Sequence, residues 1–248
     1  MKRMMVVTVA VGMICCSLAE IGDKVSFSPI DVNTYRVNAL KGDADAMYLY
    51  SICLYYGIGV RKDSSTATKY AREAAKNGCE PAFYYVARGY AKGRGVERSK
   101  EKADKFFAHF VQLAKKPNAS AMTKCCLGHC YLDGLGVETD FVNGAKCYLE
   151  SAMKGNAEGQ FRIGLCLLEA IGVKKDEKAG INWLTKSAAQ DFSLAMYQLG
   201  ECYEKGIGVA ANEKEAIEWY SKAAILGDEK SFKALERLLP QKISKDEI

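Results

Sequence analysis

Two residue pairs have the spacing of a serine nucleophile and its lysine base: Ser99 with Lys102, and Ser151 with Lys154. In penicillin-binding proteins and class A β-lactamases, this Ser-x-x-Lys motif works together with Ser-Asp-Asn and Lys-Thr-Gly motifs. Neither of those motifs occurs in this sequence. A nucleophile that lacks its base and oxyanion partners is not an active site. We therefore expect neither pair to be catalytic.

A second group combines thiols with an imidazole: Cys125, Cys126, His129 and Cys130 lie within a few residues of one another. Spacings of three and four residues bring such side chains together on a helix, and thiolate and imidazole are the ligands that zinc prefers. No second Cys-x-x-Cys or His-x-x-x-His pair completes the ligand set, and His109 is the only other histidine. We expect these side chains to pack, and we expect no metal and no cofactor.

The elements that carry these residues are repeated along the chain. A Gly-x-Gly-Val-like signature recurs at intervals of 36, 41, 36 and 36 residues. Its second glycine is Gly59, Gly95, Gly136, Gly172 and Gly208 in turn. A nucleotide-binding loop would need a preceding strand. Each signature instead follows an apolar pattern with the three-to-four-residue period of a helix. The glycines therefore predict helix-ending turns, and Ala170 replaces the first glycine of one turn.

Four residues after each of these glycines comes a residue that can cap a helix, because its short side-chain oxygen accepts from free backbone N–H groups. The five caps are Asp63, Ser99, Asp140, Asp176 and Asn212. Each repeat thus predicts a helix, a turn and a second helix, and no strand.

The pattern resembles the Sel-1-like repeat (SLR) family, a relative of the tetratricopeptide repeats. In the last copy, the matching residues are Gly200, Tyr203, Gly206, Gly208, Val209, Ala216, Trp219, Tyr220, Ala223, Ala224 and Gly227. The resemblance implies an all-α solenoid, a right-handed superhelix of five helix-turn-helix repeats with a half-repeat at each end. We place the solenoid at residues 31–240, with repeats at about 43–78, 79–114, 120–155, 156–191 and 192–227.

The N-terminal residues suggest that the protein is exported. Lys2 and Arg3 precede an apolar run over residues 4–16, and small residues follow up to Ala19. This is the pattern of a secretory signal peptide at residues 1–19, cleaved after about Ala19. We expect an irregular segment at 20–30, a polar tail at 241–248, no transmembrane segment in the mature chain, and a periplasmic or secreted protein. The net charge of +5 is too mild to predict a nucleic-acid partner.

Exported proteins can form disulfides. Cys53, Cys130, Cys166 and Cys202 share one repeat position, and equivalent positions on packed helices lie farther apart than a bridge spans. The better candidates occupy other positions, and we expect two bridges or fewer among them: Cys79, Cys125, Cys126 and Cys147.

The resemblance implies an interaction scaffold that binds a peptide or protein partner in its concave groove, without catalysis. The alternative is a cell-wall or β-lactam-directed binder or hydrolase, because β-lactamase-like activity has been ascribed to some exported SLR proteins. By analogy with tetratricopeptide repeats, the first helices supply the groove residues Tyr48, Ile52, Tyr55, Tyr56, Tyr84, Arg88, Lys92, His129 and Asp133. The aromatic residues at the Tyr48 and Tyr84 position suit the core equally well.

Overall fold

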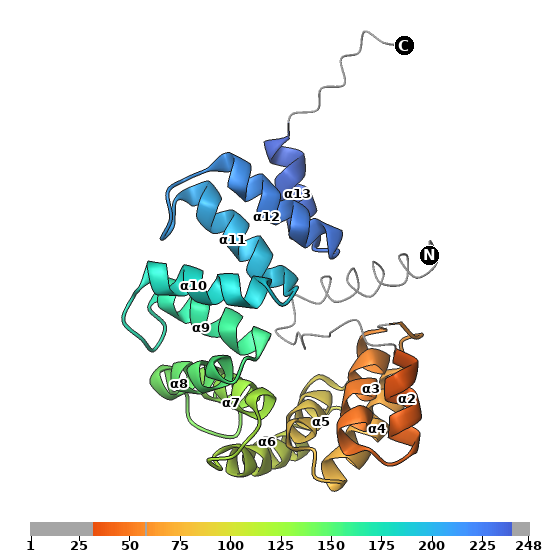
Figure 1. Ribbon diagram of the computed structural model, residues 1–248. Helices are drawn as coiled ribbons and strands as arrows, with labels where there is room; N and C mark the ends of the chain where they lie inside the picture. Colours follow the sequence, from red (N-terminus) through yellow and green to blue (C-terminus); the bar gives the residue numbers. More distant parts are fainter. Residues whose placement is uncertain (1–31, 58, 240–248) are drawn as a thin grey trace, which may run out of the picture.

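The computed structural model describes residues 32–57 and 59–239, which form twelve helices and no strands (Figure 1). The signal peptide, the segment at 20–30 and the tail at 241–248 lie outside these residues. The helices are α2 (Val32–Leu40), α3 (Ala44–Tyr56), α4 (Ser64–Lys76), α5 (Glu80–Lys92), α6 (Lys100–Ala114), α7 (Ala121–Asp133), α8 (Phe141–Met153), α9 (Ala157–Glu169), α10 (Glu177–Ala188), α11 (Ser193–Lys205), α12 (Glu213–Ile225) and α13 (Glu229–Leu238).

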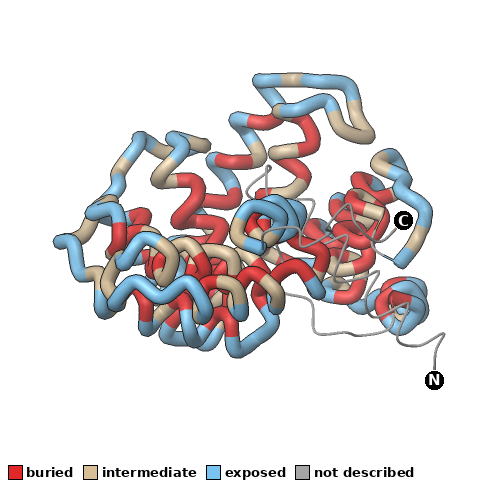
Figure 2. The backbone as a smooth tube through the Cα atoms, turned by 90° about the horizontal axis from the view of Figure 1, so that it is seen from above, coloured by how far each residue is buried: buried red, intermediate tan, exposed pale blue. Residues whose placement is uncertain are grey.

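The helices pack as five successive pairs, from α3 with α4 to α11 with α12, and each pair also contacts the next. The pairs follow an open arc in which α5 and α7 lie on the inner side and α6 and α8 on the outer side (Figure 1). Helices α2 and α13 flank the pairs as half-repeats. Buried residues follow the faces where helices meet (Figure 2). The predicted all-α solenoid is confirmed.

The five predicted caps begin the second helix of each pair. Asp63 accepts a hydrogen bond from the Thr66 backbone N–H at 3.0 Å, and the other four make the same type of contact. Since an N-cap satisfies a donor that the helix leaves free, the local sequence fixes where each second helix starts. In the described part of the chain, no helix is long and apolar enough to span a bilayer.

The second glycine of each turn is required by packing between repeats. A Cβ added to Gly95 would lie 1.8 Å from the Ser64 carbonyl oxygen, and one on Gly172 would lie 1.9 Å from that of Phe141. Both glycines also have positive φ angles, +71° and +66°. These two turns therefore pack directly on the start of the second helix of the preceding repeat. Their glycines are structural, as the sequence pattern predicted.

The third repeat departs from this register. Gly136 packs against Phe107, seven residues beyond the first residue of α6, whereas Gly172 and Gly208 pack against the first residues of α8 and α10. Seven residues are two helical turns. The extra residues 115–119 thus let α7 attach to the middle of α6 rather than to its start.

Replacing Ala170 with glycine should stabilise the protein. Ala170 ends α9 in the left-handed conformation, with φ +58°, which costs an L-residue with a Cβ roughly 1–2 kcal/mol. Glycine removes that strain but adds flexibility to the unfolded chain. We therefore expect Ala170→Gly to raise the free energy of unfolding by about 0.5–1 kcal/mol in chemical denaturation. If Ala170→Gly had a lower free energy of unfolding than the wild type, the Ala170 methyl group would make contacts that outweigh the strain.

Candidate functional site

The serines of the two Ser-x-x-Lys pairs contact backbone groups. Ser99 caps α6 by accepting from the Lys102 N–H at 3.3 Å. The Ser151 hydroxyl donates to the Ala121 carbonyl at 2.7 Å, and the Lys154 amine donates to the Ala119 carbonyl at 2.5 Å. Neither hydroxyl is paired with the lysine amine of its motif, so this geometry gives no support to a serine nucleophile.

The same serine contact recurs one repeat later. Ser187 donates to the Ala157 carbonyl at 2.7 Å, which matches the contact of Ser151 with Ala121. Each serine joins the end of the second helix of a pair to the start of the first. A contact that repeats with the period of the fold serves the packing of the helix pairs.

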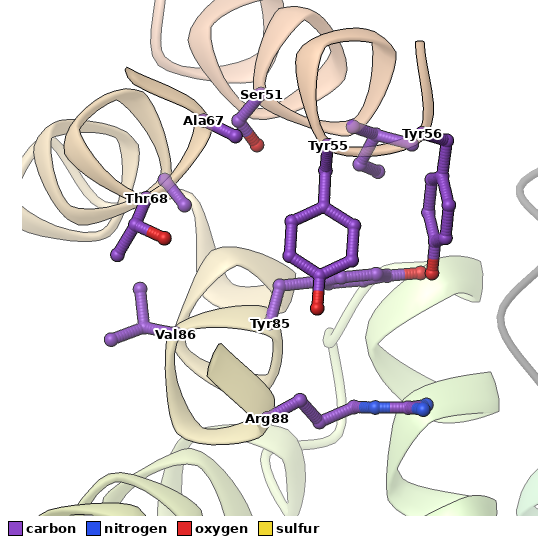
Figure 3. A pocket seen from close by; sticks show the side chains of 10 residues that line it. Ser51, Tyr55, Tyr56, Ala67, Thr68, Tyr85, Val86 and Arg88 are labelled. Carbon is purple, nitrogen blue, oxygen red and sulfur yellow. The ribbon is translucent and has the colours of Figure 1, made fainter. Parts of the chain in front are cut away.

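Two hollows lie between the helices of repeats one to four. The tyrosine pocket is enclosed by α3, α4 and α5, and its lining includes Ile52, Tyr55, Tyr56, Tyr85 and Arg88 (Figure 3). The charged hollow has a volume of about 440 Å³. Its lining is Tyr84, Arg88, Ala91, Lys92, Phe107, His129, Leu132, Asp133, Leu135, Tyr148 and Arg162. Arg88 lines both hollows, so they adjoin.

Four of the predicted groove residues present surface to solvent. Lys92 and Asp133 are exposed, while Tyr55 and Arg88 are half-buried. The Arg88 guanidinium donates to the Tyr84 hydroxyl at 3.1 Å and extends past the tyrosine pocket (Figure 3). These four side chains are the part of the predicted set that a partner can reach without rearrangement of the core.

The other five predicted groove residues are buried. Tyr48, Ile52 and Tyr84 belong to the hydrophobic core, with exposed fractions of 4%, 2% and 1%. The sequence left the Tyr48 and Tyr84 position open between the core and the groove. The structure places both side chains in the core. Tyr56 and His129 are also buried, and each lines one of the hollows.

Positive charge gathers at the junction of the hollows. The Arg94 guanidinium donates to the Tyr55 hydroxyl at 3.2 Å and lies 5.5 Å from the centre of its ring. Burial lowers the pKa of Lys92, and the charges of Arg88 and Arg94 lower it further. Burial also lowers the pKa of Arg88 to about 10. Among the residues that line the charged hollow, only Asp133 is acidic.

A buried ionisable cluster joins α7, α8 and α9 beside the charged hollow. His129 Nε2 lies 3.2 Å from Glu158 Oε1 and 3.9 Å from Cys125 Sγ, while His129 Nδ1 lies 2.8 Å from the Tyr148 hydroxyl. Arg162 Nη2 lies 3.2 Å from the same Glu158 oxygen. We call these five residues the His129 cluster. Cys125, His129 and Glu158 are all buried.

The sequence pattern did not identify Glu158 or Arg162. The repeat position of Glu158 is occupied by Asp45, Pro81, Met122 and Leu194 in the other repeats, so no periodicity singles it out. Its role depends on the contact between the start of α9 and the middle of α7, which spacing along one helix cannot show.

The protonation of the cluster follows from burial and from Arg162. Burial lowers the pKa of His129, and the charge of Arg162 lowers it further, so the ring is neutral at pH 7. Burial alone would raise the pKa of Glu158, but the hydrogen bond from His129 and the charges of His129 and Arg162 outweigh it and lower the pKa. Burial raises the pKa of the Cys125 thiol, with a further rise from Glu158. A protonated, buried thiol is a poor nucleophile.

Stability should therefore fall on acidification. The pKa of His129 is lower in the folded state than the unfolded value of about 6.5. Below that pH the unfolded state binds more protons, so the free energy of unfolding decreases by up to about 1.4 kcal/mol per pH unit until folded His129 is protonated. Four charged or titratable side chains face the His129 ring and affect its pKa: Arg88, Arg162, Cys125 and Glu158.

Denaturant titrations between about pH 5 and 7 would measure this slope. His129→Gln should flatten it, because His109 is then the only histidine left. An equal slope in both proteins would show that other groups cause the pH dependence.

All eight cysteines in the described part of the chain are buried, and no disulfide joins any two of them. They include the bridge candidates Cys79, Cys125, Cys126 and Cys147, none of which forms a disulfide in this structure. Cys126, Cys130 and Cys147 share one apolar cluster between α5 and α8. Burial raises the pKa of each of these three thiols.

The fold and the inner hollows define a helical repeat protein with a preformed concave surface. The sequence profile of the Sel1 repeat matches residues 44–79, 82–107, 119–156, 157–192 and 193–228. These segments cover most of the chain, so the protein belongs to the Sel1 repeat family, as its sequence resemblance indicated. A search of the curated proteins finds no match.

Solved structures of Sel1 repeat proteins are similar to this chain. The protective antigen c5321 of uropathogenic Escherichia coli, which has an SLR fold, is 28% identical with a TM-score of 0.53 over 82% of this chain and 42% of its own. A Sel1 repeat protein of Oxalobacter formigenes is 26% identical with a TM-score of 0.57, over 84% of this chain and 58% of its own. The chain therefore spans about half the length of these two relatives.

A more distant structure has the same fold. The immunity protein Pa5087 of Pseudomonas aeruginosa is 20% identical, with a TM-score of 0.56 over 81% of this chain and 72% of its own. At this identity the likeness concerns the fold alone.

Proposed function

We propose that the protein is an exported interaction scaffold whose concave face binds an acidic segment of a peptide or protein partner. The observation that carries this proposal is a group of three cations around the two hollows: Arg88 lines both, Lys92 lines the charged hollow, and Arg94 contacts Tyr55 of the tyrosine pocket. Stacked helical repeats present extended concave surfaces of this kind for binding. Export rests on the signal-peptide pattern at residues 1–19.

The side chains of this group suit recognition of carboxylates. Arginine binds a carboxylate through two parallel N–H donors, and charge-assisted hydrogen bonds are the stronger ones in proteins. Arg88 and Arg94 each already contact a tyrosine hydroxyl, which restricts where their guanidinium groups point. A preorganised donor loses less conformational freedom on binding.

The charge balance favours an anionic partner over a neutral one. The cations at the junction lower the pKa of Lys92, which means that they repel one another in the free protein. A carboxylate placed among them would relieve this repulsion. Tyrosine and arginine are also the residue types that dominate binding energies at protein interfaces.

The size of the site supports side-chain recognition. The charged hollow, at about 440 Å³, falls within the range of small-ligand pockets, roughly 300–1,000 Å³. It can therefore take one or two side chains of an extended or helical segment, with the tyrosine pocket beside it.

Peptide selection tests this function. A library of random linear peptides displayed on phage would be panned against the purified protein, and the selected peptides measured by fluorescence polarisation. We expect peptides rich in Asp and Glu. The Arg88→Glu/Lys92→Glu double variant should bind them at least about 100-fold more weakly, since hydrogen bonds to charged groups contribute roughly 1.5–3 kcal/mol each.

The control variant reverses the same number of charges on the outer helices. Lys100→Glu/Lys146→Glu changes exposed lysines on α6 and α8 and should leave the affinity within about threefold. Equal weakening by both double variants would show non-specific attraction by net charge. Unchanged affinity in Arg88→Glu/Lys92→Glu would place binding elsewhere.

A further inference from the structure

We propose that Cys125, His129 and Glu158 bind one divalent cation of the zinc class, at a site that adjoins the charged hollow through His129. One donor atom from each of the three side chains lies within 4.8 Å of the other two. All three residues are buried, and they come from two consecutive repeats.

The spacing of the donor atoms matches tetrahedral zinc. Zn–S distances of about 2.3 Å and Zn–N and Zn–O distances of about 2.0–2.1 Å place tetrahedral donor atoms roughly 3.3–3.6 Å apart. His129 Nε2 lies 3.2 Å from Glu158 Oε1 and 3.9 Å from Cys125 Sγ. Both distances differ from the tetrahedral values by only a few tenths of an ångström, and Cys125 Sγ and the Glu158 carboxylate lie within 4.8 Å of each other.

The backbone fixes the three ligands relative to one another. Cys125 and His129 are four residues apart in α7, so they lie on the same face of that helix. Glu158 is the second residue of α9, and Asn156 caps this helix by accepting from the Gly159 N–H at 2.7 Å. Because α7 and α9 pack against each other, the third ligand is held at a defined place.

A partner for the second ring nitrogen is already present. A histidine that binds a metal through Nε2 almost always donates its Nδ1–H to an oxygen, and this contact orients the ring. The Tyr148 hydroxyl lies 2.8 Å from His129 Nδ1 and is itself buried. A hydroxyl can rotate to accept as well as donate, so Tyr148 can hold the ring with Nε2 directed at the cation.

The donor set selects the cation. A thiolate and an imidazole favour zinc over magnesium or calcium, which prefer oxygen ligands. Arg162 donates to Glu158 Oε1, the same oxygen that faces His129, and a carboxylate oxygen has two lone pairs, so Oε1 can keep this hydrogen bond while it binds the cation. His129 also lines the charged hollow, from which water can supply a fourth ligand.

This inference departs from the expectation drawn from the sequence. Packing was favoured over metal binding there because the thiols and His129 lacked a further ligand. Glu158 supplies it from the next repeat, through the contact between α7 and α9.

Cobalt(II) is the probe that reports the site directly. The purified mature chain, residues 20–248, reduced with a phosphine that does not chelate metals, would be titrated with Co²⁺ and followed by absorption. We expect one equivalent of Co²⁺ to produce thiolate-to-cobalt charge transfer and the visible bands of tetrahedral Co²⁺, and Zn²⁺ to abolish both. Cys125→Ser should lose the charge-transfer band, whereas Cys126→Ser, which removes the neighbouring buried thiol, should keep it.

Two further variants address the carboxylate and the orienting hydroxyl. Glu158→Gln should weaken Co²⁺ binding at least about 100-fold, and Tyr148→Phe about 10–100-fold. Circular dichroism would verify that each variant is folded. The absence of charge transfer from the wild-type chain, or equal bands in wild type and Glu158→Gln, would overturn the site. A band that survives Cys125→Ser and disappears in Cys126→Ser would overturn the assignment of the thiol.

Discussion

Replacing Glu158 with alanine in metal-free buffer should lower the free energy of unfolding by about 3–5 kcal/mol. Glu158 is 2% exposed and is the carboxylate that both His129 and Arg162 contact. Its loss leaves the largely buried Arg162 guanidinium without its 3.2 Å ion pair. Removing one partner of a buried pair is costly because the remaining charge keeps its desolvation penalty. Chemical denaturation measures the change.

A surface carboxylate provides the control. Glu101 pairs with Lys105 on α6, where both side chains are more than 70% exposed. Such pairs contribute roughly 0–1 kcal/mol, so Glu101→Ala should change the stability only slightly. If Glu158→Ala cost no more than Glu101→Ala, the His129 cluster would not be a stabilising part of the fold.

Replacing Gly172 with alanine should lower the free energy of unfolding by roughly 2–5 kcal/mol. The positive φ angle of +66° costs an alanine roughly 1–2 kcal/mol. The new Cβ would also lie 1.9 Å from the Phe141 carbonyl oxygen, and overpacking adds about 1–3 kcal/mol. Since the clash is with backbone, repeats three and four would have to move apart.

Gly155→Ala separates the two contributions. Gly155 has a φ of +84°, but an added Cβ would meet nothing within 4 Å. This variant should show the backbone strain alone, roughly 1–2 kcal/mol. Equal losses in Gly155→Ala and Gly172→Ala would show that the contact with Phe141 relaxes freely.

The fold could be predicted from the sequence because its determinants are local and repeated. A cap such as Asp176 acts within three residues, and a turn glycine such as Gly172 acts at one position. Five copies of each signal reinforce one another, so the exception at Ala170 did not alter the prediction. The shift of the third repeat along α6 was not predicted, because it depends on how residues 115–119 place α7.

The candidate site was only partly predictable. The repeat period places Arg88, Lys92 and Asp133 on the inner helices, and the structure puts them in one hollow. The period cannot distinguish a groove residue from a core residue, which is why Tyr48 and Ile52 were assigned to the groove although they are buried. Burial depends on the neighbouring helices, which one repeat does not specify.

The His129 cluster depends on a single long-range contact. Cys125 and His129 are visible as a pair in α7, but their carboxylate lies 29 residues beyond His129 in the next repeat. No other repeat has a glutamate at this position, and only the first has a carboxylate there, Asp45. A site that occurs once in a periodic structure leaves no trace in the period.

Site-specific photo-crosslinking shows whether the partner lies against the concave face. A photoreactive amino acid would replace Lys92 in the charged hollow or, in a matched protein, Lys146 on the outer helix α8. Each protein would be irradiated with a selected acidic peptide, and the products identified by mass spectrometry. We expect crosslinks from position 92 and none above background from position 146. Crosslinks from position 146 alone would contradict binding by the concave face and place the partner on the outer face.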